Sequence, residues 1–276
     1  MRIELRQATA LGTATMAALS IGCMLVWRAT DAHDPPDDAE VNVASDTLHP
    51  QDTENVYDLV QTVRTPGSPH VLRAVRRLGD LSVFKRFQTQ IGDYGGIQAL
   101  IDLLPIDCRN MDSDSKDLTV AILVALNNLS VHGTNHSIMH AAHVEFLVAE
   151  VYEQPSLDLS VRLPCLRLLC NLAMWAESSQ TLLALPVIHT LAADLLTSSS
   201  ADWSDKILQL FVNLTDPASL ASVVLTQHAA VESIVDATIS FCEVEGDHVT
   251  SRQHDNAQII VRNVTLITSS VQPVQS

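Results

Sequence analysis

Apolar residues follow a helical spacing through most of this chain. Between Val56 and Ile267 they recur at positions i, i+3, i+4 and i+7, and no strand-like alternation interrupts them. Gly95-Gly96-Ile97 predicts a turn that enters a helix. Residues 117–131 carry their leucines and valines on one side, as one long helix does. The pattern therefore predicts an all-α domain over residues 56–268.

A three-residue motif, called the tag from here on, ends successive leucine-rich stretches. The strict copies are Asn128-Leu129-Ser130, Asn171-Leu172-Ala173 and Asn213-Leu214-Thr215, with looser copies at Asp80-Leu81-Ser82 and Asn263-Val264-Thr265. The strict copies lie 43 and then 42 residues apart. A period in the low forties with helical spacing inside each unit is typical of armadillo and HEAT α-solenoids. We expect an armadillo-type α-solenoid of about four to five repeats, each with two shorter helices and a longer third helix that ends at the tag.

Two polar stretches lengthen individual units of this pattern. One is residues 106–116, and the other, residues 243–256, brings the last tag spacing to 50 residues. Solenoids accept insertions at the edges of their units. Both stretches are therefore predicted to be loops.

Composition narrows the function to binding. Hydrophobic residues make up 47% of the chain and aromatic residues 4%, which suits helices packed on helices. The net charge of −16 argues against general nucleic-acid binding, because that requires a basic surface. The chain contains no Walker loop, no G-x-G-x-x-G and no G-x-S-x-G motif. Since stacked repeats form an extended binding surface, we expect a protein-binding scaffold and not an enzyme, with no cofactor.

The N-terminus carries a predicted membrane anchor. Residues 8–27 contain no charge and lie between Arg6 and Arg28, and as a helix they span roughly 30 Å, the thickness of a bilayer core. We expect an uncleaved signal anchor over residues 1–28, with one transmembrane helix at 8–27. A cleaved secretory signal is the alternative, but Asp31 fits poorly at the cleavage site.

Small residues form a row in this anchor. Ala14, Ala18 and Gly22 recur every four residues, a spacing that lets two such helices approach closely. Self-association of the chain is therefore left open.

The segment after the anchor is acidic and poor in apolar residues. Residues 29–55 contain eight Asp or Glu, no Lys or Arg, and three prolines. Such a segment cannot bury enough surface to offset its ordering entropy, so we expect a disordered linker. Residues 269–276 are expected to form a short tail.

Several segments of the chain match one family of repeat proteins. They are Ile21-Gly22-Cys23, Trp27-Arg28, Gly95-Gly96-Ile97, Ala125-Leu126-Asn127-Asn128-Leu129-Ser130-Val131, Leu166-Arg167-Leu168-Leu169-Cys170-Asn171-Leu172 and Leu208-Gln209-Leu210-Phe211-Val212-Asn213-Leu214-Thr215-Asp216-Pro217-Ala218. Over the anchor and roughly residues 56–268, the chain resembles the armadillo-repeat-containing proteins of the X-linked cluster type and their autosomal relatives.

The resemblance implies a protein of the mitochondrial outer membrane with its armadillo domain in the cytosol. There it would influence mitochondrial distribution, clustering or dynamics through Miro GTPases and trafficking kinesin adaptors. The chain departs from the family because Arg28 alone, and not a basic segment, separates the anchor from the acidic linker. An endoplasmic-reticulum anchor is therefore one alternative. A soluble armadillo protein with nuclear or cytoskeletal partners is another.

The tag asparagines are the first candidate binding residues. In armadillo architecture the third helix lines the concave face, and Asn128, Asn171 and Asn213 are expected there to bond the backbone of an extended peptide. Importin-type binders place Trp four residues before this Asn. Here those positions hold Arg76, Val124, Arg167 and Gln209, so recognition of a nuclear localisation signal is not expected.

Basic residues gather in the first part of the domain. They are Arg64, Arg73, Arg76, Arg77, Lys85 and Arg86, while the remainder of the domain is acid-rich. The hypothesis is that this end accepts an acidic segment through charge complementarity, from a partner or from the linker of this chain. The alternative is a solvated basic helix face.

Histidines form the strongest apparent chemical cluster. His136, His140 and His143 share a predicted helix face, with His132 nearby, and imidazoles at i and i+4 can chelate zinc. No carboxylate stands where a metalloprotease motif requires it. We therefore interpret these histidines as solvated or partly packed and predict no metal site.

Overall fold

A computed structural model describes residues 55–104, 111–155, 157–220, 226–245 and 249–271. The chain divides into two compact units, and the described residues belong to the second, Thr53–Ser276. The predicted anchor at 1–28 and the linker up to residue 54 lie outside the described residues, as does the tail from residue 272.

Helices form all the regular structure in the described residues, and no strand occurs among them. They are α3 (Val56–Arg64), α4 (Val71–Leu81), α5 (Lys85–Asp93), α6 (Gly96–Asp102), α7 (Ser113–Leu129), α8 (Gly133–Ala141), α9 (Val144–Tyr152), α10 (Leu159–Leu172), α11 (Ala176–Leu183), α12 (Val187–Thr197), α13 (Ala201–Leu214), α14 (Pro217–Leu220), α15 (His228–Glu245) and α16 (Ser251–Val271). The predicted all-α class is confirmed.

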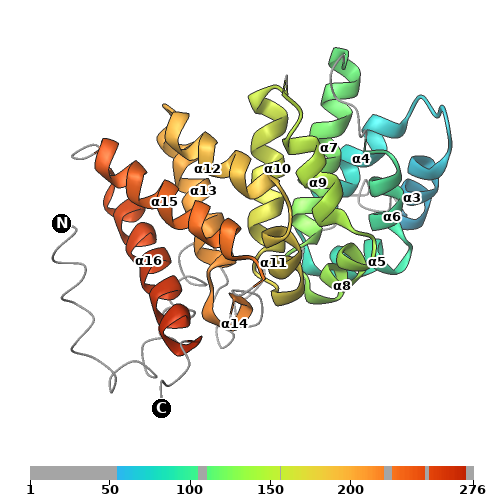
Figure 1. The fold of residues 1–276 in the computed structure, drawn as a ribbon. Helices are drawn as coiled ribbons and strands as arrows, with labels where there is room; N and C mark the ends of the chain where they lie inside the picture. Colours follow the sequence, from blue (N-terminus) through green and yellow to red (C-terminus); the bar gives the residue numbers. More distant parts are fainter. Residues whose placement is uncertain (1–54, 105–110, 156, 221–225, 246–248, 272–276) are drawn as a thin grey trace, which may run out of the picture. The chain divides into compact units, whose positions relative to one another are not determined.

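These helices repeat as units of three. The triplets are α5 to α7, α8 to α10, α11 to α13 and α14 to α16, and the pair α3 and α4 precedes them as the last two helices of a further unit. Each third helix packs on the next, in the order α4, α7, α10, α13 and α16. Figure 1 shows this row with the short first helices α5, α8, α11 and α14 along one edge. The predicted armadillo-type solenoid is confirmed for the described residues.

The tags end the third helices, as predicted. Leu81, Leu129, Leu172 and Leu214 are the last residues of α4, α7, α10 and α13. The loosest copy differs, because Asn263 lies inside α16, which continues to Val271. That helix also enters the expected tail at residues 269–276.

The second predicted loop, residues 243–256, is largely helical. The helix α15 continues to Glu245 and α16 begins at Ser251, so much of the longer tag spacing is helix. The helix predicted over 117–131 runs from Ser113 to Leu129 instead. Its earlier start has a local cause, because the Asp112 side chain accepts a hydrogen bond from the Ser115 amide at 2.8 Å and caps it.

The turn before α6 depends on a glycine. Gly95 adopts a left-handed backbone conformation with φ 71°, and Arg64 donates a hydrogen bond to its carbonyl at 3.1 Å. A Cβ atom at this position would lie 2.3 Å from the Arg64 guanidinium. The predicted turn at Gly95-Gly96 is therefore confirmed, and Arg64 has a structural role in it.

The apolar faces of the units form one continuous core. Leu126, Leu169 and Phe211, one from each of three consecutive third helices, are all fully buried. Cys165 and Cys170 are buried free cysteines in the same core. Burial is the main cause that raises the pKa of the Cys170 thiol to about 12.

A search for membrane-spanning helices finds no single candidate in the described part of the chain. One bent pair, α11 with α12, meets the length and composition requirement together, with an angle of 81° at its break.

Candidate protein-binding face

The tag asparagines connect consecutive third helices. Each side-chain amide donates a hydrogen bond to the backbone carbonyl of the residue just before the tag of the preceding unit. The bonds run from Asn128 to Gly79 at 3.3 Å, from Asn171 to Asn127 at 3.2 Å and from Asn213 to Cys170 at 2.9 Å. The same bond therefore recurs at each of these junctions, where it fixes how one third helix lies on the next.

This bond leaves the side-chain oxygens of two tag residues for a ligand. Asn128, Asn171 and Asn213 are half-buried. Their nitrogens serve the stacking of units, whereas no hydrogen bond from the described residues reaches the side-chain oxygens of Asn128 and Asn171. Those two oxygens can accept hydrogen bonds from a ligand backbone. The predicted ligand contact of the tag residues stays a prediction.

The positions four residues before the tags are not equivalent in exposure. Arg76 and Arg167 are exposed, and Val124 is 41% exposed. Gln209 is only 5% exposed, and its amide donates to the Asn213 side chain at 3.5 Å. The first three can line a binding face, while Gln209 supports the Asn213 side chain from inside.

Five of the six predicted basic residues separate into two groups, and the sixth, Arg64, bonds the Gly95 carbonyl as described above. Arg73 and Arg76 are exposed on α4, and Arg77 beside them is half-buried. These three residues therefore share the outer side of α4. Lys85 and Arg86 instead begin α5, where the Arg86 guanidinium lies 4.5 Å from the centre of the Phe87 ring.

An acidic partner for Arg76 was not expected from the sequence. Asp117 on α7 forms an ion pair with Arg76 at 2.8 Å, and both side chains are more than half exposed. Arg73 and Arg167 form no ion pair with the described residues. The third-helix face, defined as the exposed side of α4, α7, α10 and α13, is therefore most basic at α4.

Further ion pairs start from residues near the beginnings of the third helices α7 and α10. Lys116 on α7 pairs with Asp158 at 2.7 Å, and its hydrogen bond is the largest cause that lowers the pKa of that carboxyl to about 2. Arg162 on α10 pairs with Asp194 at 3.4 Å, and the Tyr152 hydroxyl donates to the same carboxylate at 2.6 Å. These bonds again cross between consecutive units.

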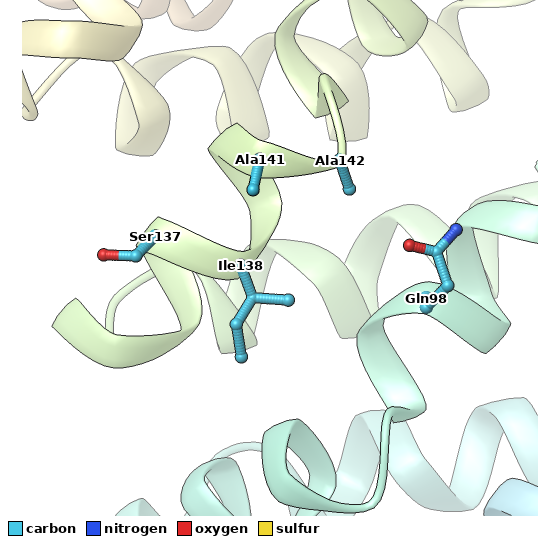
Figure 2. A pocket seen from close by; sticks show the side chains of 5 residues that line it. All are labelled: Gln98, Ser137, Ile138, Ala141 and Ala142. Atoms are coloured by element: carbon cyan, nitrogen blue, oxygen red, sulfur yellow. The ribbon is translucent and has the colours of Figure 1, made fainter.

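A shallow hollow lies away from the third-helix face. It has a volume of about 420 Å³ and is lined by Gln98 of α6 and by Ser137, Ile138, Ala141 and Ala142 at α8 (Figure 2). None of the sequence-predicted binding residues lines it. It offers three apolar side chains, one hydroxyl and one amide, and no charged group lines it.

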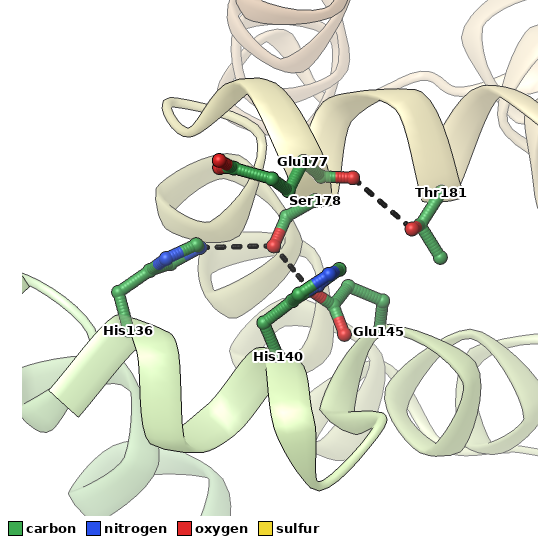
Figure 3. A network of polar contacts seen from close by, with 6 residues as sticks. All are labelled: His136, His140, Glu145, Glu177, Ser178 and Thr181. Carbon is green, nitrogen blue, oxygen red and sulfur yellow. Dashed lines mark hydrogen bonds and ion pairs between the residues drawn. The ribbon is translucent and has the colours of Figure 1, made fainter.

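The histidine cluster is a packing network. His136 is 3% exposed, stacks on Trp175 with ring centres 4.5 Å apart, and shares a hydrogen bond of 2.9 Å with the Ser178 hydroxyl. Ser178 also donates to the buried carboxylate of Glu145, which lies 2.8 Å from a nitrogen of His140 (Figure 3). No group of three metal-ligating side chains occurs in the part of the chain that the structure describes.

The network favours a neutral His136. Burial is the main cause that lowers the pKa of His136, and the Glu145 carboxylate opposes it. The serine, histidine and carboxylate do not form a nucleophile relay, because Glu145 contacts Ser178 and His140 and not the second nitrogen of His136. Ser178 is also fully buried. The network therefore joins α8 and α9 to α11.

Known proteins resemble this chain in fold. A family model described as armadillo-like matches residues 48–240. One designed armadillo repeat protein superposes with a TM-score of 0.60 at 14% identity, covering 77% of this chain and 83% of its own. Computationally designed armadillo repeat proteins for modular peptide recognition reach 0.62 at 13% identity, over 79% and 87%. A third design, solved with the peptide (KR)4, reaches 0.54 at 13% identity, over 76% and 99%. No curated protein matches the chain.

Proposed function

Because this chain belongs to the armadillo-like family, we propose that it is a non-enzymatic scaffold that binds an extended protein segment along its third-helix face. One observation carries this proposal. The hydrogen bond from a tag Asn to the preceding third helix, called the tag bond from here on, repeats from α4 to α13 and sets the third helices side by side. The side-chain oxygens of Asn128 and Asn171 remain open to a ligand. Repeating units that present equivalent groups suit a ligand that is itself a repeating backbone.

Charge indicates which ligand this face accepts at its first end. The described design that binds (KR)4 has a basic ligand, whereas here α4 presents Arg73, Arg76 and Arg77 and α10 presents Arg167. Asp117 neutralises part of this charge. We propose a ligand with acidic residues at the α4 end, because complementary charge steers encounter and excludes basic competitors.

A peptide of residues 29–54 provides a direct test, because it is acidic and lacks Lys and Arg. Its binding to the full chain is followed by fluorescence anisotropy over a range of salt concentrations. Reversing Arg73, Arg76 and Arg77 to Glu should weaken binding about tenfold or more and flatten its salt dependence. The matched control reverses Arg262, an exposed residue of α16, and should leave binding unchanged. Equal affinity and salt dependence in both variants would exclude the acidic ligand.

For the cellular role, we propose an adaptor anchored in the mitochondrial outer membrane through residues 8–27, with its armadillo domain in the cytosol. Support comes from the uncharged run between Arg6 and Arg28 and from the resemblance described above. The adaptor would organise mitochondrial distribution, clustering or dynamics through Miro GTPases and trafficking kinesin adaptors.

Fusing residues 1–35 to a fluorescent protein tests the location separately from the binding face. Mitochondrial rims are the expected pattern, and a reticular pattern would instead support an endoplasmic-reticulum scaffold. Release of the full chain by alkaline carbonate would favour the soluble alternative. The partners are tested by proximity labelling from the full chain, with the triple reversal on α4 as the comparison.

A further inference from the structure

The turns from third helices into first helices carry exposed apolar side chains at one repeated position. In each of these turns, one residue separates the C-cap of a third helix from the N-cap of the first helix that follows. This residue is Val83, Val131 or Met174 in three consecutive turns. Their side chains are 66%, 67% and 48% exposed. We call these three residues the turn row.

Further exposed apolar side chains belong to the same turns or to the first helices that follow them. Phe84, 56% exposed, adjoins Val83, and Ile138 on α8 is 38% exposed. Together these five make up five of the thirteen large hydrophobic side chains that are exposed among the described residues. Single exposed hydrophobics need no explanation, but grouped ones mark interaction sites. The equivalent position in the next unit is Asp216, so the apolar row ends there.

Charge changes sign along this row. The helix after Val83 begins with Lys85 and Arg86, and the helix after Met174 begins with Ala176 and the exposed Glu177. The helix after Val131 begins with Gly133 and Thr134, which carry no charge. The row therefore has a basic end, a neutral middle and an acidic end.

We propose that the turn row is a self-association face that pairs two copies of this chain in antiparallel orientation, with the twofold axis beside Val131. In that arrangement Val83 and Phe84 of one copy meet Met174 of the other, and Lys85 meets Glu177. An isologous interface requires such self-complementarity, because each contact occurs twice.

The charge pattern selects this occupant and this orientation. A parallel pairing would place Lys85 and Arg86 against the same residues of the second copy, which repels. Antiparallel pairing joins unlike charges at both ends and leaves uncharged residues at the axis. Consecutive units stand about 8–10 Å apart when helices pack, so the three positions keep a common spacing in both copies.

This face is separate from the proposed peptide-binding face. In Figure 1 the first helices α5, α8 and α11 lie along one edge, and each residue of the turn row lies in a turn that leads into one of them. The third-helix face is made by the exposed sides of α4, α7, α10 and α13. Association through the turn row would therefore leave both third-helix faces open, and a dimer would present two of them.

The apolar contribution is tested with the full chain in mild detergent by sedimentation equilibrium. Val131→Ser should weaken the dimer about tenfold or more, because the side chain is lost from both copies at the axis. Leu159→Ser is the matched control, since Leu159 has the same 67% exposure but begins α10, outside the row. It should leave the dissociation constant unchanged.

The charge contribution is tested by exchange. Lys85→Glu makes both ends more acidic, and Glu177→Lys makes both ends basic, so each variant alone should lose dimer at least about tenfold. An equimolar mixture of the two should recover it as a heterodimer, because each contact then joins unlike charges. Lys85 forms no ion pair with the described residues, so its reversal removes no such contact inside the domain.

Three results would overturn the proposal. The first is a full chain that stays monomeric at about 100 µM, well above the dissociation constants of micromolar complexes. The second is association that Val131→Ser leaves unchanged. The third is a mixture of the two charge variants that associates no better than either variant alone. Association that persists in all variants would instead assign self-association to residues 1–54.

Discussion

Consecutive units of this protein are joined along two rows, and the two rows use different chemistry. Between third helices, a tag Asn donates to a backbone carbonyl at every junction from α4 to α13. Between first helices, the contact position repeats but the residues do not. Asn135 of α8 donates to the carbonyl of Gln88 on α5 at 3.0 Å, and His136 of α8 bonds Ser178 of α11.

The first-helix contacts occupy equivalent places in their units. In each case the fourth residue of one first helix meets the third residue of the next. One junction uses an amide and a carbonyl, and the other uses an imidazole, a hydroxyl and a buried carboxylate. The comparison teaches that backbone geometry repeats more strictly than side-chain chemistry in this solenoid.

The largest expected effect breaks the first-helix row. His136→Ala removes a buried ring that stacks on Trp175 and leaves Ser178 without that partner, so the free energy of unfolding should fall by about 2–4 kcal/mol. Urea unfolding measures this change. Ser137→Ala, at the exposed neighbouring residue, should change stability by less than about 0.5 kcal/mol. A loss below about 1 kcal/mol for His136→Ala would show that the network is dispensable.

A smaller effect is expected in the third-helix row. Asn171→Ala removes the bond to the carbonyl of Asn127 and should cost about 1–2 kcal/mol, because that carbonyl still accepts a hydrogen bond from the Ser130 hydroxyl at 2.7 Å. Asn127→Ala keeps the carbonyl and loses only its side-chain acceptor at 3.1 Å, so it should cost less. A double-mutant cycle measures the coupling. Equal losses from the two variants would contradict the assigned bond.

Acidification should weaken the contacts between first helices and leave the tag bonds between third helices unchanged. Because the pKa of His136 is lowered in the folded protein, the unfolded chain binds a proton at a pH where the folded protein does not. Stability from this group is complete above about pH 6.5 and is lost as the pH falls through the lower folded pKa, at no more than about 1.4 kcal/mol per pH unit.

The groups that face His136 are His140 on α8, Glu145 on α9 and Glu177 on α11. Urea midpoints between pH 7 and pH 5 should therefore fall less steeply in His136→Gln than in the unsubstituted chain. Asn171→Ala serves as the comparison and should keep the original slope. Parallel pH profiles for His136→Gln and the unsubstituted chain would remove His136 as the cause.

The smallest effect concerns the exposed ion pair that crosses the third-helix row. Asp117→Asn should change the free energy of unfolding by about 0–1 kcal/mol, because Arg76 and Asp117 are both largely solvated. It should strengthen binding of the 29–54 peptide, since it releases Arg76. Thermal unfolding and anisotropy measure the two effects. A large loss of stability with weaker peptide binding would show that this pair is structural.

Sequence reasoning predicted the fold because the third-helix row repeats its residue types. Each strict tag closes a helix at a leucine, and the spacing of 43 and 42 residues follows from that repetition. It missed the helical content of residues 243–256, because polar residues on the exposed sides of α15 and α16 resemble a loop in one dimension.

The candidate site was harder to predict than the fold. The exposure of Arg76 and Arg167 could be predicted from their place four residues before the tag. The burial of Gln209 could not, because the neighbouring side chains determine how exposed that position is. The partners Asp117 and Ser178 lie 41 and 42 residues from Arg76 and His136. Their residue types do not recur between units, so no pattern along the chain points to them.

The tag bond also affects how a repeat protein of this kind can gain units by duplication during evolution. The Asn128 and Asn171 side chains each donate to the unit before them, and the carbonyl just before each of these tags accepts from the unit after it. A duplicated stretch such as residues 130–172, inserted after Leu172, would find both partners already in place. New units can therefore be inherited without any new bond having to evolve. The pattern changes at α16, where the helix runs eight residues past Asn263.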